Sequence, residues 1–159
     1  MTDYENLLTL LARAGVEFIV VGGVAASAHG SARVTEDLDV VYARSPGNMK
    51  RLVDALASTN PYLRGAPPGL PFKFDEETIA KGLNFTLTTD FGWLDLLGEI
   101  TGGGGFEQLL PHSVKIPVFG IECWLLGLER LIQLKRAAGR PKDFEAIAEL
   151  ERIFEQESR

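Results

Sequence analysis

Residues 18–41 read FIVVGGVAASAHGSARVTEDLDVV, and two features of this stretch decide the fold. A short apolar run ends in the pair Gly22-Gly23, and after thirteen further residues Asp37 and Asp39 flank Leu38. Successive side chains of a strand alternate between its faces, so the two carboxylates point the same way. They suit magnesium, which prefers oxygen ligands and usually takes one or two protein carboxylates. By itself, however, such a pair is more often an edge strand or turn with solvated acids.

A third acid, Asp95, lies within the apolar run Trp93–Leu97, which the pattern predicts as the return strand of a hairpin after a turn at Phe91-Gly92. Burying this carboxylate without a partner would cost several kcal/mol. A metal ion shared with Asp37 and Asp39 would remove that cost. Alternatively, Asp95 is solvated or pairs with an arginine. The three acids together favour a metal site.

Composition and charge exclude several classes of protein. The chain has 159 residues, 45% of them hydrophobic, which fits a single domain with one core. A formal net charge of -6 argues against a general basic field for long nucleic acids. The single Cys123, with His29 and His112 far apart in the sequence, excludes an intramolecular disulfide and a zinc-ligand cluster, and it fits a cytoplasmic setting. No apolar run is long enough for a membrane span, and the charged residues of the first twenty are unlike a signal peptide.

Hydrophobic periodicity predicts alternating helices and strands. Helices are expected over residues 4–14, 24–29, 46–58, 75–81 and 106–110, and strands over 17–21, 37–43, 84–88, 93–97 and 114–119. The Pro- and Gly-rich residues 60–71 predict a surface loop without regular structure. An apolar stripe from Leu125 to Leu134 and another from Phe144 to Phe154 predict two closing helices, separated at Gly139-Arg140-Pro141. The expected class is α/β (α+β), a small mixed β-sheet flanked by helices, with the C-terminal helices closing a cleft.

In order and spacing, Gly22-Gly23, Asp37-Leu38-Asp39 and the later Asp95 resemble the nucleotidyltransferase superfamily, which has the DNA polymerase β type of fold. The resemblance implies that Gly22 and Gly23 present backbone N–H groups to a nucleoside triphosphate at a helix N-terminus. It also implies that Asp37, Asp39 and Asp95 are catalytic and hold two metal ions, Mg²⁺ or Mn²⁺, which activate the attacking group and neutralise the departing pyrophosphate. Asp95 is expected to help deprotonate the acceptor. Residues 1–159 would then be a single nucleotidyltransferase-like domain, with a catalytic sheet core over about 1–120 and C-terminal helices over about 121–159.

The likeness extends to the minimal bacterial and archaeal nucleotidyltransferases, including the toxin-type group named after the AbiEii toxin. It rests on Ala28-His29-Gly30, Arg33, Thr35 and Glu36, and on Lys135 and the segment from Gly139 to Asp143. This resemblance implies that Lys135, with Arg33 and Arg140, binds the triphosphate of a substrate such as ATP. It also implies a cognate toxin or antitoxin partner. The toxin-type enzymes are usually longer, with additional helices that often contact the acceptor, so RNA such as tRNA, a protein and a small molecule all remain open as acceptor.

Each of these cations also has a structural interpretation. Arg33 either binds phosphate or pairs with Glu36. Lys135 lies near a helix C-terminus, where cations stabilise the helix dipole. Arg140 and Asp143 fit a solvated turn, with Asp143 as the N-cap of the last helix. His29 is more often a packing residue than a ligand and is not assigned to the site.

Two other nucleotide-binding motifs are excluded. Gly102–Gly105 is not followed by Lys-Ser or Lys-Thr, as a P-loop requires, and the Gly22 segment lacks the Gly-x-Gly-x-x-Gly spacing of a dinucleotide fold. The sequence therefore predicts a metal-dependent nucleotidyltransferase, working alone or as a homodimer. The alternative is a non-catalytic nucleotide-binding or partner-binding regulatory protein on the same fold.

Overall fold

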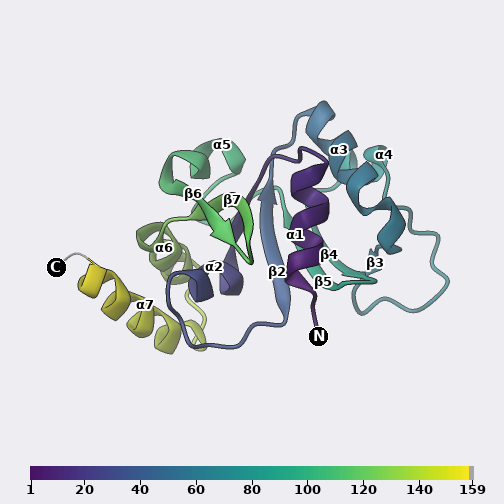
Figure 1. Ribbon diagram of the computed structural model, residues 1–159. Coiled ribbons are helices and arrows are strands. Elements are labelled where there is room, and N and C mark those ends of the chain that lie inside the picture. The colour runs from purple at the N-terminus through teal and green to yellow at the C-terminus, as the bar shows by residue number, and fades with distance from the viewer. Residues whose placement is uncertain (158–159) are drawn as a thin grey trace.

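The computed structural model describes residues 1–157, and its strands form a mixed seven-stranded sheet with helices packed against it (Figure 1). The strand order is β3-β4-β5-β2-β1-β7-β6. Strands β2 and β5 pair in parallel, as do β1 and β7, and the other neighbours are antiparallel. The expected fold class, a mixed sheet flanked by helices, is confirmed.

The N-terminal half builds the centre of the sheet. Its elements are α1 (Tyr4–Arg13), β1 (Phe18–Val21), α2 (Gly22–Ala28), β2 (Asp37–Tyr42), α3 (Pro46–Leu56), the 3₁₀ turn η1 (Ala57–Thr59) and β3 (Tyr62–Leu63). Helix α1 begins where the Asp3 carboxylate accepts a hydrogen bond from the backbone N–H of Asn6, a normal N-cap. Helix α3 begins with Ser45 as N-cap and Pro46 in its first turn, as its sequence predicts.

The C-terminal half completes both edges of the sheet and ends in two helices. Its elements are α4 (Glu76–Lys81), β4 (Asn84–Thr89), β5 (Gly92–Leu97), α5 (Phe106–Leu109), η2 (Leu110–His112), β6 (Ser113–Val118), β7 (Ile121–Leu126), α6 (Leu128–Ala138) and α7 (Asp143–Glu157). In Figure 1, α3 and α4 lie on the β4–β5 side of β2, α2, α6 and α7 lie on the side of β6 and β7, and α1 lies in front of the sheet near β2.

Three sequence predictions of secondary structure need correction. Residues 60–71 contain strand β3, because Tyr62 and Leu63 pair with β4 between the proline and glycine positions. Leu125 lies in β7, not in a helix; its side chain is buried there, and the helices of the C-terminal segment begin at Leu128 rather than at about 121. Helix α2 begins at Gly22, two residues before the expected start at residue 24, so the Gly22-Gly23 pair belongs to its first turn. For β3 and β7, tertiary pairing decides a short segment that local patterns describe poorly.

Two hydrophobic clusters hold the elements together. The larger lies against the sheet and includes Leu7, Leu8 and Leu11 of α1 with Leu38 of β2 and Leu94 of β5. The smaller joins α2 to the C-terminal helices through Ala26, Leu128, Ile132, Ile147 and Leu150. Burial of these side chains fixes α6 and α7 against α2. Among the described residues, no helix is long and apolar enough to cross a membrane.

Candidate metal centre and phosphate cleft

Strands β2 and β5 bring the three predicted acids together. Their parallel register places Asp39 opposite Asp95 and Asp37 opposite Trp93. Asp37, Asp39 and Asp95 each offer a carboxylate oxygen, and these oxygens all lie within 4.8 Å of one another. Three carboxylates this close repel one another unless a proton, a cation or a metal ion lies among them. The cluster can therefore hold a metal ion.

Electrostatics single out Asp39. Burial, together with the charges of Asp37 and Asp95, raises the pKa of Asp39 to about 8. Its Oδ1 atom is buried and has no hydrogen-bond partner among residues 1–157. Burial and the neighbouring Asp37 also raise the pKa of Asp95, while the charge of Arg64 opposes the rise. A hard cation would bind such a buried carboxylate oxygen and supply the partner that it lacks.

The Gly22-Gly23 pair lets the backbone of α2 approach these acids closely. A Cβ on Gly22 would lie 2.2 Å from Oδ2 of Asp39, and a Cβ on Gly23 would lie 2.5 Å from the Thr35 hydroxyl. Gly22 also has a φ of 67°, which favours glycine. Only glycine fits at both positions in this conformation.

Arg64 is a site residue that the sequence prediction missed. Its Nη2 lies 2.8 Å from Oδ1 of Asp95, and its Nη1 lies 3.8 Å from Oδ2 of Asp37. The guanidinium also lies over the ring of Trp93, with Cζ 4.7 Å from the centroid. Of the two alternatives for Asp95 without a metal, pairing with an arginine is the one observed. The sequence indicated that a buried Asp95 needs a partner. It did not point to Arg64, because residues 60–71 were predicted as an exposed loop.

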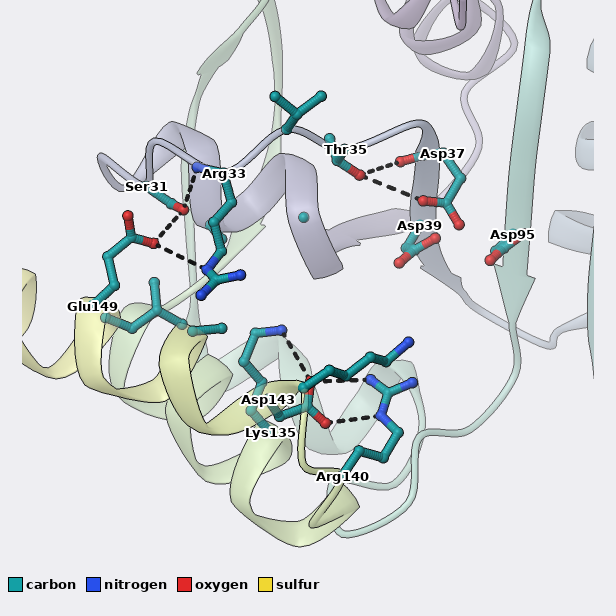
Figure 2. A pocket seen from close by; sticks show the side chains of 16 residues that line it. Ser31, Arg33, Thr35, Asp37, Asp39, Asp95, Lys135, Arg140, Asp143 and Glu149 are labelled. Carbon is teal, nitrogen blue, oxygen red and sulfur yellow. Dashed lines mark hydrogen bonds and ion pairs between the residues drawn. The ribbon is translucent and has the colours of Figure 1, made fainter.

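A cleft of about 450 Å³ extends from the acids to the C-terminal helices. Figure 2 shows Asp37, Asp39 and Asp95 on one side of it, with Lys135 and Arg140 across from them. Its lining also includes Gly23, Arg33, Lys142 and Asp143. The cleft thus has an acidic wall on the sheet and a basic wall at the junction of α6 and α7.

Asp143 organises the basic wall. Its side chain is only 5% exposed; Nε of Arg140 donates to Oδ2 at 2.8 Å, and Nζ of Lys135 lies 3.9 Å from Oδ1. The hydrogen bond from Arg140 lowers the pKa of Asp143. Asp143 is the first residue of α7. Its nearly buried carboxylate pairs with Lys135 and Arg140, so this segment is not a solvated turn. Among the described residues, no ion pair includes Lys142, which lines the cleft beside them.

Arg33 pairs with α7 and not with Glu36. Its Nη2 lies 3.3 Å from Oε2 of Glu145, and its Nε lies 3.9 Å from Oε1 of Glu149. Glu149 also accepts hydrogen bonds from the Ser31 hydroxyl at 2.6 Å and from the Ala32 N–H at 3.1 Å. These contacts tie the segment before β2 to α7. The Arg33 side chain remains 46% exposed at the rim of the cleft.

The structure therefore brings the predicted site residues into one region. Asp37, Asp39, Asp95, Gly23, Arg33, Lys135 and Arg140 all line the cleft, and Gly22 packs against Asp39 behind it. In sequence they are spread from residue 22 to residue 140.

Comparison of the fold with solved structures gives a match over almost the whole chain. A Thermotoga maritima protein described as a "putative nucleotidyltransferase" superposes with a TM-score of 0.59 at 13% identity, over 92% of this chain and 88% of the other. The chain has a nucleotidyltransferase-like fold. By sequence, no protein-family model and no curated protein matches it. At this identity the likeness concerns the fold, and the acidic cluster carries the chemical inference.

Proposed function

We propose that this chain is a metal-dependent nucleotidyltransferase, which moves a nucleoside monophosphate from a nucleoside triphosphate to an acceptor hydroxyl. The observation that carries the proposal is the cleft in which three clustered carboxylates face Lys135 and Arg140. A triphosphate needs both walls, because its phosphates require cations along their length and a metal ion where charge develops on reaction. The nucleotidyltransferase-like fold supports the same activity.

The three acids fit a divalent cation by their donor chemistry. Mg²⁺ and Mn²⁺ prefer carboxylate oxygens, and the buried Oδ1 of Asp39 has no hydrogen-bond partner. Asp37, Asp39 and Asp95 would hold the ion or ions. When bound, such cations supply activation of the attacking oxygen and neutralisation of the leaving pyrophosphate.

The other residues would bind and orient the triphosphate. Lys135 and Arg140, held in place by Asp143, would bind its phosphates from α6 and α7, with Arg33 at the rim. Gly23 lines the cleft and would present its backbone N–H to a phosphate, whereas Gly22 would allow Asp39 to lie close to α2. In the reaction, the acceptor oxygen bonds to the α-phosphorus, the bond from that phosphorus to the bridging oxygen breaks, and pyrophosphate leaves. Asp95 would take the hydroxyl proton, since burial and the neighbouring Asp37 raise its pKa above that of an ordinary aspartate and so make it a stronger base.

We further propose that residues 1–159 act as one nucleotidyltransferase-like domain of the minimal, AbiEii toxin-like group. Lys135, Arg140 and Asp143, the residues on which the C-terminal resemblance rests, lie together at the cleft, and this supports the assignment. The proposal includes ATP as a substrate, a cytoplasmic setting and a toxin or antitoxin partner. RNA such as tRNA, a protein and a small molecule remain the candidate acceptors, and a homodimer across the C-terminal helices remains a candidate assembly.

The activity can be tested by incubating the protein with each α-³²P-labelled nucleoside triphosphate, Mg²⁺, and cellular RNA, protein or small-molecule extracts. We expect transfer of label that requires Mg²⁺ and is lost in Asp39→Ala. Asp54→Ala is a matched control, because Asp54 is exposed and pairs only with Lys50 among the described residues. Transfer that persists in Asp39→Ala would refute the assignment.

The alternative, a non-catalytic regulatory protein, makes a different prediction in the same preparation. If no acceptor is labelled, thermal unfolding with each nucleoside triphosphate and Mg²⁺ distinguishes the transferase from a partner-binding regulatory protein that binds no nucleotide. A ligand that binds only the folded protein stabilises it by about 2.7 kcal/mol at a hundredfold excess over its dissociation constant. Absence of Mg²⁺-dependent stabilisation with every nucleotide favours the regulatory protein.

A further inference from the structure

Arg64 lies at the edge of the acidic cluster that faces β4. Besides its ion pairs with Asp95 and Asp37, its Nη2 donates a hydrogen bond of 2.8 Å to the carbonyl oxygen of Leu87. Its guanidinium also lies over the ring of Trp93, and its side chain is only 18% exposed. The side chain is therefore held beside the acids from several directions.

The pairing of Arg64 with the acids is nevertheless incomplete. A guanidinium commonly binds a carboxylate through two parallel hydrogen bonds. Here Nη2 approaches Oδ1 of Asp95 to 2.8 Å, yet that oxygen accepts no aligned hydrogen bond. Within the part of the chain that the structure describes, the Nε of Arg64 and Oδ1 of Asp39 are also buried without hydrogen-bond partners. The contact between Arg64 and Asp95 is therefore mainly a charge interaction. The hydrogen-bonding capacity of Oδ1 of Asp95 is not used in it.

We propose that Arg64 is a built-in counter-ion that competes with the divalent cation for Asp95 and Asp37. The inference rests on the metal site of the proposed function. With all three acids ionised, the carboxylates and the guanidinium carry a net charge of −2, which one divalent cation balances. Cation binding displaces the guanidinium from its contact with Asp95, because two positive groups close to the same carboxylate repel each other.

This competition has a consequence for substrate binding. The cluster binds a free cation weakly while Arg64 is in place. A cation that arrives with a nucleoside triphosphate brings negative charge with it and does not face the full repulsion of the guanidinium. Arg64 therefore favours the metal–nucleotide complex over the free metal ion.

The first test measures Mg²⁺ affinity by titration calorimetry without nucleotide. We expect Arg64→Gln to bind Mg²⁺ about tenfold more tightly than wild type, because a unit charge a few Å from the ion is removed from a half-buried site. Arg64→Lys keeps the charge but loses the planar group over Trp93, so its affinity should lie between the two. Arg44→Gln is a matched control: Arg44 also lies over an aromatic ring, that of Tyr42, and bonds the Ile79 and Ala80 carbonyl oxygens, away from the acids. Its affinity should equal that of wild type.

The second test follows Trp93 directly in a Trp124→Phe background, which leaves Trp93 as the single tryptophan. Mg²⁺ should change the Trp93 emission when Arg64 is present and leave it unchanged when Arg64 is glutamine. If Arg64→Gln does not fold, both measurements are made on Arg64→Lys.

The outcomes separate this inference from the proposed function. Wild-type Mg²⁺ binding that is lost in Asp39→Ala, together with unchanged or weaker binding in the Arg64 variants, overturns the role of Arg64 and leaves the metal site standing. Absence of Mg²⁺ binding in wild type and in every Arg64 variant overturns both.

Discussion

At the residue scale, Asp39 is the group whose state the fold controls most strongly. Asp39 lies in β2, the central strand of the sheet, with Gly22 on one side of its carboxylate and Asp95 of β5 on the other. Burial and two neighbouring carboxylates raise its pKa to about 8, so near neutral pH the metal-free protein holds a proton there. A cation must displace that proton, which couples metal binding to pH.

The first prediction concerns stability without metal. The unfolded chain ionises Asp39 near pH 3.9, but the folded chain keeps its proton up to about pH 8. Between these values the folded state binds the extra proton, so this residue makes the free energy of unfolding fall as pH rises. The side chain in Asp39→Asn does not titrate, so it causes no such fall in the free energy of unfolding. In EDTA, urea denaturation should show that the stability of the variant relative to wild type increases by at least about 1.4 kcal/mol, the equivalent of one pKa unit, between pH 5 and pH 8.

The comparison is made between variant and wild type at each pH, so titrating groups that do not interact with Asp39 cancel. Asp54→Asn, at an exposed position, should show no such pH-dependent difference. A stability difference for Asp39→Asn that stays constant from pH 5 to pH 8 would contradict the raised pKa.

The three acids could be predicted because strand alternation is a local rule: Asp37 and Asp39 share a face wherever the strand lies. The Arg64 partnership could not be predicted in the same way. It depends on β3 pairing with β4, which carries residue 64 to the edge of the cluster. Nothing within residues 60–71 distinguishes this arginine from a solvated one.

At the element scale, the missed strands show the same limit. Strand β7 pairs with β1 on one side and β6 on the other, and its burial comes from these neighbours. Its sequence, Ile121–Leu126, merges with the apolar stripe of α6, so periodicity alone extends the helix too far. The long, strongly patterned helices α1 and α3 were predicted well because their caps and apolar faces are contained in their own residues.

The second prediction concerns the junction of β1 and α2. Gly22→Ala should destabilise the protein and weaken Mg²⁺ binding, because the new methyl group overlaps the Asp39 carboxylate and the backbone has a positive φ. Gly120→Ala is a matched control, since Gly120 has a φ of 78° but no atom within 4 Å of an added Cβ. We expect Gly120→Ala to cost about 1 kcal/mol with normal Mg²⁺ affinity. Gly22→Ala should cost at least about 1 kcal/mol more.

Urea denaturation and Mg²⁺ calorimetry on the two variants separate backbone strain from close packing. Equal destabilisation and equal Mg²⁺ affinity in both would mean that Gly22 serves only the backbone conformation. The contact between α2 and Asp39 would then have no role in the site.

At the scale of the whole molecule, the two walls of the cleft belong to different parts of the fold. The acids are fixed by the centre of the sheet, whereas Lys135, Arg140 and Asp143 belong to α6, α7 and their connection. Although the chain carries a net charge of -6, basic side chains line the side of the cleft opposite the acids. A triphosphate bound there would bridge the two parts of the fold. The smaller hydrophobic cluster and the Glu149 contacts with residues 31–33 hold the C-terminal helices against α2.

The third prediction follows from this division. A nucleoside triphosphate bound with Mg²⁺ should slow amide hydrogen exchange in residues 139–150, because it links the basic wall to the sheet and suppresses local opening of α7. Mg²⁺ alone contacts only the acids and should leave this segment unchanged. The measurement is hydrogen–deuterium exchange by mass spectrometry, with each common nucleotide supplied as an α,β-non-hydrolysable analogue. Lys135→Ala should lose the protection, whereas Lys115→Ala, whose ammonium lies by Trp124 outside the cleft, should retain it. Equal protection by Mg²⁺ alone, or full protection in Lys135→Ala, would mean that the phosphates do not reach the basic wall.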